Sequence, residues 1–239
     1  MTGRIQSLLR RHRLLPLSRE NPAKNTHCRE FEVDNWAISQ FVLRKLVPVV
    51  GTSPFPLHEL MLIVATVCRL RPPQIFEWGT NIGKSTRIFH ECVTHFDIAS
   101  KIHSTDLPDE ASHGEHPHGA RGKLVRGRPG VYLHQGDGLN TSLDLWRARG
   151  REPRPLFLVD GDHEYESVLR ELTGITCEVP EAAILLHDAF YQSEESGYNV
   201  GPYRAIEEVA HALPGRYLKL HSGMGLPGLT LLYPPWKAK

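Results

Sequence analysis

The sequence predicts an α/β fold with a mostly parallel sheet, and two patterns support this prediction. From Gln74 onward, short apolar segments alternate with segments of helical periodicity, as in folds whose helices connect parallel strands and cover both faces of the sheet. Five of the expected strands end at or close to an acidic residue, and open parallel sheets bind ligands at the carboxyl ends of their strands. The 239 residues are enough for one such domain with a small appendage.

Composition and charge exclude several other classes of protein. Hydrophobic residues make up 40% of the chain and charged residues 23%, as in ordinary globular proteins. The net charge of +1 gives no electrostatic reason to expect nucleic-acid binding, and no apolar run reaches the roughly 20 residues of a membrane span. The four cysteines lack Cys-x-x-Cys spacing, so we expect free thiols in a cytoplasmic protein.

The chain before the first strand predicts a helical cap. Residues 1–25 are basic and then contain proline and asparagine, so this tail is expected to be poorly ordered. Apolar residues recur at helical intervals over 30–70, and the segment 51–56 separates two helices. We therefore divide the chain into a tail and N-terminal helical cap, 1–70, that can cover the ligand site, and a ligand-binding domain, 71–239.

Regular alternation of strands and helices follows the cap. Strands are expected at 75–79, 101–105, 131–135, 155–159, 182–186, 216–221 and 228–233. Helices are expected at 84–95, 140–149, 164–177 and 202–213. The short link 222–227 predicts that the last two strands form an antiparallel hairpin. The result is a Rossmann-like sheet of seven strands, mostly parallel, with helices on both faces.

The segment 107–130 is too long for an ordinary connection between a strand and the next element. It contains His113, His116 and His118. Clustered histidines can bind a metal, but no further ligand group follows at a fixed spacing. A lid that shields a reaction from water is the preferred interpretation.

A glycine turn at 77–85 is the strongest sign of a ligand site. Gly79 and Gly83 are spaced as G-x-x-x-G between a strand and a helix, which lets the backbone and the free N–H groups of the helix approach a small ligand. The turn is one residue too short for a phosphate-binding P-loop, and Asn81 rules out the dinucleotide pattern G-x-G-x-x-G. Because the carboxylate of Glu77 disfavours phosphates, we expect a zwitterionic or cationic nucleotide-like ligand, namely S-adenosylmethionine. A tight turn without a ligand is the alternative.

Further acids follow at the ends of later strands. Asp106 ends the second strand, about 20–30 residues after the turn, where nucleotide-binding α/β folds hold the ribose hydroxyls. Its alternative role is that of a helix cap or a solvated loop residue.

Asp160 and Asp188 end two strands that are expected to be neighbours, with His187 beside them. Two carboxylates and an imidazole can form a divalent-cation site. His163 follows on the same loop as Asp160 and can act on a bound group without being a ligand. Asp162 is expected to cap the next helix.

Several motifs together resemble those of class I S-adenosylmethionine-dependent methyltransferases. They are EWGTNIGKST (77–86), Asp106, GD (136–137), VDGDHEY (159–165) and HD (187–188). Within that family the chain resembles the small-molecule O-methyltransferase branch that includes the macrolide-sugar methyltransferases and cephalosporin hydroxylase-like proteins. The resemblance covers roughly residues 70–235, and the D-G-x-H-x-Y segment is its most specific part.

The resemblance implies a function and a set of site residues. The implied reaction is methyl transfer from S-adenosylmethionine to a hydroxyl of a sugar or another small metabolite. Implied cofactor contacts are Gly79, Thr80, Gly83 and Ser85 around the methionine part, Glu77 beneath it, Asp106 at the ribose, Asp137 near the adenine, and Asp160. Implied metal ligands are Asp160, His187 and Asp188, with Mg²⁺ as the expected ion. His163 would be the general base.

One departure from the branch concerns the metal. A glutamate usually stands where this chain has His187, and a histidine removes a negative charge and suits softer metals than Mg²⁺. The metal's identity and presence therefore stay open, and a metal-independent methyltransferase of the same fold is one alternative. A non-catalytic protein that binds S-adenosylmethionine or a nucleoside is another. A hydroxylase is disfavoured, because no redox cofactor is indicated. Homo-oligomer formation is left open.

Overall fold

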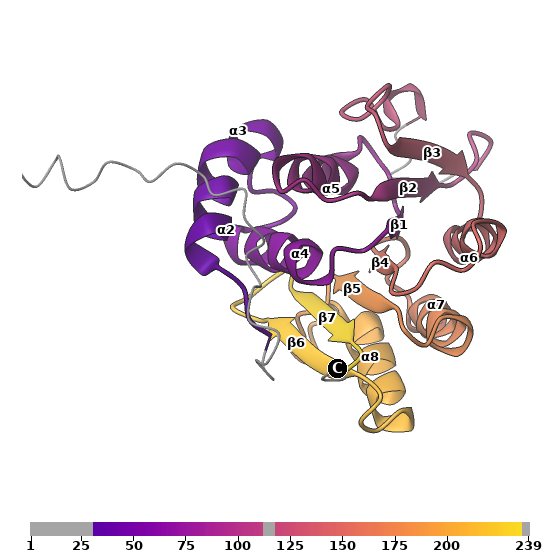
Figure 1. Ribbon diagram of the computed structural model, residues 1–239. Helices are drawn as coiled ribbons and strands as arrows, with labels where there is room; N and C mark the ends of the chain where they lie inside the picture. Colours follow the sequence, from indigo (N-terminus) through magenta and orange to yellow (C-terminus); the bar gives the residue numbers. More distant parts are fainter. Residues whose placement is uncertain (1–30, 112–117, 236–239) are drawn as a thin grey trace, which may run out of the picture.

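The computed structural model describes residues 31–111 and 118–235, and a seven-stranded sheet lies at its centre (Figure 1). Its strands are β1 (Gln74–Trp78), β2 (Lys101–Asp106), β3 (Val131–Gln135), β4 (Leu156–Val159), β5 (Ala183–His187), β6 (Leu218–Ser222) and β7 (Leu229–Tyr233). The strand order is β3-β2-β1-β4-β5-β7-β6. The first five are parallel, whereas β7 is antiparallel to both β5 and β6. The predicted fold class is therefore confirmed, including the terminal hairpin.

The helices lie on both faces of this sheet. They are α2 (Asn35–Phe41), η1 (Val42–Leu46), α3 (Val47–Val50), α4 (Leu57–Leu70), α5 (Lys84–His95), η2 (His118–Ala120), α6 (Gly138–Ala148), α7 (Tyr165–Glu178) and α8 (Val200–Ala212). One face carries α2, α4 and α5, and the other carries α6, α7 and α8 (Figure 1). In β4, Leu156 and Leu158 belong to the core on the first face, whereas Phe157 and Val159 belong to the core on the second. Burial on both faces explains why β4 and β5 are almost wholly apolar.

Most predicted element boundaries differ from the observed ones by one or two residues, and three of these differences have a clear local reason. β1 ends at Trp78 because Gly79 has a positive φ of 91°. The helix expected at 140–149 begins at Gly138, because the Asp137 side chain accepts a hydrogen bond from the Asn140 N–H and caps it. The helix expected at 202–213 begins at Val200, since a proline such as Pro202 is tolerated in a first turn.

The cap packs directly on the sheet. In α4 nine residues from Glu59 to Cys68 are buried, and the apolar ones among them share a core with β1, β4 and β5. None of the helices within residues 31–111 and 118–235 is long and apolar enough to cross a lipid bilayer.

Some of the predictions fall outside the described residues. These are the basic tail, Cys28, His113 and His116. His118 is described and lies exposed in η2. Cys68, Cys92 and Cys177 are free thiols, as expected.

Candidate active site

The glycine turn is fixed by close backbone contacts. A Cβ on Gly79 would lie 2.0 Å from the carbonyl oxygen of Asp160, so the turn after β1 packs against the end of β4. Gly83 is the N-cap residue of α5 with a positive φ of 89°, and its N–H donates to the Thr80 carbonyl at 2.7 Å. A Cβ there would lie 2.9 Å from Cγ2 of Val125. Both positions therefore require glycine.

Glu77 lies buried beneath this turn. Its Oε1 accepts hydrogen bonds from the hydroxyls of Ser104, at 2.7 Å, and Thr86. Burial raises the pKa of Glu77 to about 7, although the hydroxyls of Ser104, Thr86 and Ser85 favour the charged form. Its Oε2 is buried without a hydrogen-bond partner in the described part of the chain. Thr80 extends the network, with its hydroxyl 2.6 Å from that of Ser104.

Asp106 joins the end of β2 to the glycine turn. Its Oδ2 accepts from the Asn81 N–H at 2.9 Å, and its Oδ1 accepts from the Leu107 N–H at 2.8 Å. The guanidinium of Arg121 lies 3.7 Å from the same carboxylate. Asp106 is therefore placed beside the turn, as the sequence predicts, and is held there by the backbone.

Asp137 has structural partners of its own. Its Oδ1 accepts from the Asn140 N–H at 2.8 Å, and its Oδ2 pairs with Arg170 at 2.7 Å. This carboxylate caps α6 and joins it to α7. The structure thus gives Asp137 a role in the fold that the sequence pattern did not indicate.

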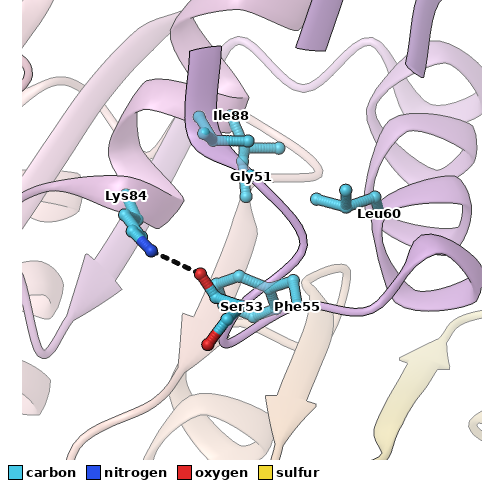
Figure 2. Close-up of a pocket in the computed structure, with 7 residues that line it drawn as sticks. Gly51, Ser53, Phe55, Leu60, Lys84 and Ile88 are labelled. Atoms are coloured by element: carbon cyan, nitrogen blue, oxygen red, sulfur yellow. Dashed lines mark hydrogen bonds between the residues drawn. The ribbon is translucent and has the colours of Figure 1, made fainter. Parts of the chain in front are cut away.

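Lys84 connects the turn to the cap. Its ammonium group donates to the Ser53 carbonyl across a small hollow that Phe55, Leu60 and Ile88 also line (Figure 2). In a P-loop the corresponding lysine would contact phosphates. Here the lysine that makes the segment look like a P-loop instead holds the loop 51–56 against the start of α5.

The second part of the site lies at the ends of β4 and β5, which pair in parallel. There the structure brings together Asp160, His187 and Asp188, the three residues predicted as metal ligands. Nδ1 of His187 lies 3.0 Å from Oδ1 of Asp160 and 3.1 Å from Oδ2 of Asp188. The two carboxylates therefore face the same ring nitrogen.

Glu59 is a member of this cluster that sequence reasoning missed. It lies on α4 and is fully buried, and its Oε2 is 3.2 Å from Nε2 of His187. Phe55 packs beside the imidazole, with ring centroids 4.4 Å apart. The available signal was a carboxylate within the apolar run 57–70, because a buried acid needs a polar partner.

The carboxylates dominate the electrostatics of His187. Burial disfavours the charged imidazole, but the surrounding carboxylates, with Asp160 contributing most, raise the pKa of His187 to about 12. Burial alone would raise the pKa of Asp188, but hydrogen bonding to His187 lowers it. Without a metal, His187 is therefore an imidazolium that neutralises part of the cluster's negative charge.

His163 lies on the outer side of the cluster. Its Nε2 is 3.5 Å from Oδ2 of Asp188, and its side chain is 45% exposed. Asp162 fixes the loop, since its carboxylate accepts hydrogen bonds from the Glu164 N–H and the Ser167 hydroxyl at the start of α7. The N-cap residue of α7 is Glu164 and not Asp162, so the predicted helix cap is wrong. Asp162 instead holds the turn before the helix, and His163 is left able to meet a ligand.

The cluster fits a divalent cation. Its candidate ligand atoms all lie within 4.8 Å of one another. Neighbouring ligands of an octahedral ion with bonds of 2.1 Å are about 3.0 Å apart, close to the separations observed around Nδ1 of His187. Two carboxylates suit magnesium or manganese, and the imidazole extends the choice to zinc or iron.

Comparisons with known proteins identify the fold. No protein-family model matches the sequence, and no curated protein matches it. The SAH-bound methyltransferase PaMTH1 of Podospora anserina aligns with a TM-score of 0.53 and 16% identity, over 99% of this chain and 97% of that one. An O-methyltransferase of Bacillus cereus in complex with SAH gives 0.51 and 17%, over 83% and 97%.

CalS11, a TDP-rhamnose 3′-O-methyltransferase of calicheamicin biosynthesis, aligns with a TM-score of 0.50 and 15% identity, over 82% of this chain and 92% of that one. At these identities the likeness concerns the fold. The chain therefore has the fold of S-adenosylmethionine-dependent O-methyltransferases.

Proposed function

We propose that this protein is an S-adenosylmethionine-dependent O-methyltransferase that acts on a hydroxyl of a small molecule with the help of a divalent cation. The observation that supports this most strongly is the cluster of Asp160, His187 and Asp188, with His163 beside it, at the strand ends next to the glycine turn. The SAH bound to neighbours of the same fold supports the cofactor. The sugar substrate in the name of CalS11 supports a hydroxylated acceptor.

The proposed cofactor site is the glycine turn and the strand ends around it. Its proposed members are Glu77, Gly79, Thr80, Gly83, Ser85, Asp106, Asp137 and Asp160. The close backbone packing at Gly79 holds the turn against the end of β4, next to the proposed metal ligands. Asp106 lies next to Asn81 of the turn, where a carboxylate can accept from ribose hydroxyls. The buried Oε2 of Glu77, which has no hydrogen-bond partner among the described residues, can place negative charge beneath a sulfonium and an ammonium group.

The proposed reaction is an in-line displacement. The acceptor oxygen forms a bond to the methyl carbon, the bond from that carbon to sulfur breaks, and neutral S-adenosylhomocysteine leaves. His163 takes the hydroxyl proton on its exposed imidazole. Asp160, His187 and Asp188 would hold a divalent cation, which would lower the pKa of the acceptor hydroxyl. Correct positioning of the two substrates supplies much of the remaining rate.

A metal-independent methyltransferase is the second candidate, and one observation favours it. The imidazole of His187 has carboxylates at both of its ring nitrogens. A protonated His187 could therefore hold the cluster together without an added cation. His163 would then act on the acceptor hydroxyl by itself.

Binding and turnover measurements test these proposals together. S-adenosylmethionine affinity is measured by calorimetry, and methyl transfer is followed on a panel of sugars, phenols and other hydroxylated metabolites, before and after chelation. We expect micromolar cofactor binding and turnover that chelation abolishes and Mg²⁺ or Mn²⁺ restores. Turnover that survives exhaustive chelation would favour the metal-independent enzyme. Tight cofactor binding without turnover on the whole panel would favour a non-catalytic binding protein.

A further inference from the structure

We propose that Glu59 of the helical cap is a positioning residue, which directs Nδ1 of His187 at Asp160 and Asp188 and thereby sets the affinity of the site for a divalent cation. This inference rests on the metal-assisted form of the proposed function. It adds a residue from α4, a segment outside the sheet, to a site that otherwise consists of strand ends.

The two oxygens of the Glu59 carboxylate contact different parts of the chain. Oε1 accepts from the Gly228 N–H at 2.8 Å, where the chain enters β7. Oε2 lies 3.2 Å from Nε2 of His187 in an ion-pair contact, and neither of these two atoms forms a hydrogen bond within the described part of the chain. Because Glu59 is fully buried, water does not compete for the carboxylate.

This contact determines which ring nitrogen of His187 can bind a cation. When a cation replaces the Nδ1 proton between Asp160 and Asp188, the carboxylate beside Nε2 favours keeping the remaining proton on Nε2, so that the neutral imidazole offers the lone pair of Nδ1. Nδ1 is the nitrogen that faces Asp160 and Asp188. Phe55 packs against the ring and limits its rotation. The cap therefore contributes both the tautomer and the orientation of the imidazole.

The substitution Glu59→Gln reverses this tautomer with little change in shape. The Gly228 N–H needs an acceptor, so the amide oxygen of the glutamine takes that place and its NH₂ group faces Nε2 of His187. Nε2 must then accept, which puts the proton on Nδ1 and blocks the cation. We expect the Kd for Mn²⁺, measured by electron paramagnetic resonance, to rise roughly 10- to 100-fold. S-adenosylmethionine affinity should be unchanged.

Glu171→Gln is the matched control. Glu171 is another buried carboxylate, on α7, and the groups acting on it are Trp78, Arg170, Asp137 and Asp162 and not the cluster. It should leave the Mn²⁺ affinity at the wild-type value. An equal loss in both variants would show that any buried glutamine weakens the site, and would overturn the inference.

A double-mutant cycle separates positioning from a structural role. In His187→Glu the ligand is a carboxylate, which has no tautomer to set and can accept from the side-chain amide that Glu59→Gln introduces. Adding E59Q to that variant should therefore not weaken Mn²⁺ binding further. A further 10-fold loss in the double variant would overturn the proposal.

Nitrogen NMR of the Mg²⁺-loaded wild-type protein gives a test that needs no stable E59Q variant. With the resonances of His187 identified by their absence in H187E, we expect Nε2 to be protonated and Nδ1 not. A proton on Nδ1 would overturn the inference. If wild type binds Mn²⁺ tightly and E59Q binds it equally well, this inference alone fails. If wild type binds no divalent cation, the metal-assisted function fails and the inference fails with it.

Discussion

The glycine turn and the carboxylate–histidine cluster lie at neighbouring strand ends but are built in different ways. The turn is a contiguous segment whose shape depends on glycine, since a Cβ on Gly79 would meet a backbone oxygen at 2.0 Å. The cluster depends on side chains from three separate segments, with Glu59 on α4, Asp160 after β4 and His187 at the end of β5. The backbone thus fixes where the cofactor would bind, whereas side chains tune the proposed chemistry.

The largest expected effect concerns the turn. Gly79→Ala forces a Cβ into the Asp160 carbonyl at a residue with a positive φ, so we expect S-adenosylmethionine binding to be lost and stability to fall by about 3 kcal/mol. Gly119→Ala is the control, because a Cβ there meets nothing within 4 Å. Calorimetry and thermal unfolding measure both. Wild-type cofactor affinity in G79A would contradict the assignment of the turn.

The second-largest expected effect is a loss of turnover when His163, beside the cluster, is replaced. His163→Ala should lower kcat roughly 10²- to 10⁴-fold by removing the general base, while cofactor affinity stays unchanged. His211→Ala, at an exposed position of α8, is the matched control. Steady-state kinetics on an accepted substrate make the comparison. Wild-type kcat in H163A would rule out the role of base.

Chelation should separate the two regions. Removing divalent cations is expected to lower the rate by at least about tenfold, because the acceptor hydroxyl then keeps its ordinary pKa. Cofactor binding should change little, since Asp160 is the one proposed cofactor contact that is also a proposed metal ligand. If chelation weakens S-adenosylmethionine binding as much as turnover, the two regions are not independent.

A smaller effect concerns stability and pH. Burial raises the pKa of Glu77 from 4.5 to about 7 in the folded protein, so the folded state holds a proton that the unfolded state releases. The free energy of unfolding should therefore fall as pH rises from 4.5 to 7, by on the order of 3 kcal/mol. Glu77→Gln should flatten this fall in denaturant titrations of the cofactor-free protein. Glu171 has a similarly raised pKa, so part of the fall in the free energy of unfolding with pH should remain in E77Q. A fall as steep in E77Q as in the wild type would contradict the burial argument.

The smallest effect is expected at Lys84. Lys84→Met removes the contact with the Ser53 carbonyl (Figure 2), which should cost less than about 1 kcal/mol. Cofactor affinity should stay at the wild-type value, because this lysine binds the cap. A large loss of cofactor affinity would instead indicate that Lys84 contacts the ligand.

The sequence predicted the parts of the fold that depend on local patterns. Helix α5 and strand β3 have the expected bounds, because glycine and apolar periodicity set them within a few residues. Asp160 and Asp188 were also placed correctly together, since parallel neighbours align their carboxyl ends. The clustering of acids at one edge of the sheet can therefore be predicted from the order of the strands and the acids that follow them.

Contacts between segments far apart in the sequence could not be predicted from local patterns. Glu59 and Gly228 are 169 positions apart, and only the packing of α4 on the sheet brings them together. Asp137 is still only a predicted cofactor contact, and nothing in the sequence indicated that it also caps α6 and pairs with Arg170. An acid at a strand end looks the same in the sequence whether or not its side chain caps a helix. Its hydrogen-bond partners are therefore known only from the structure.

A crystal structure of the protein soaked with S-adenosylhomocysteine and Mn²⁺, with anomalous diffraction at the manganese edge, tests the central claim most directly. We predict S-adenosylhomocysteine over the turn of Gly79 and Gly83. We also predict an anomalous peak from a manganese ion coordinated by Asp160, Asp188 and Nδ1 of His187. S-adenosylhomocysteine elsewhere, or no manganese among these three side chains at saturating concentration, would contradict it.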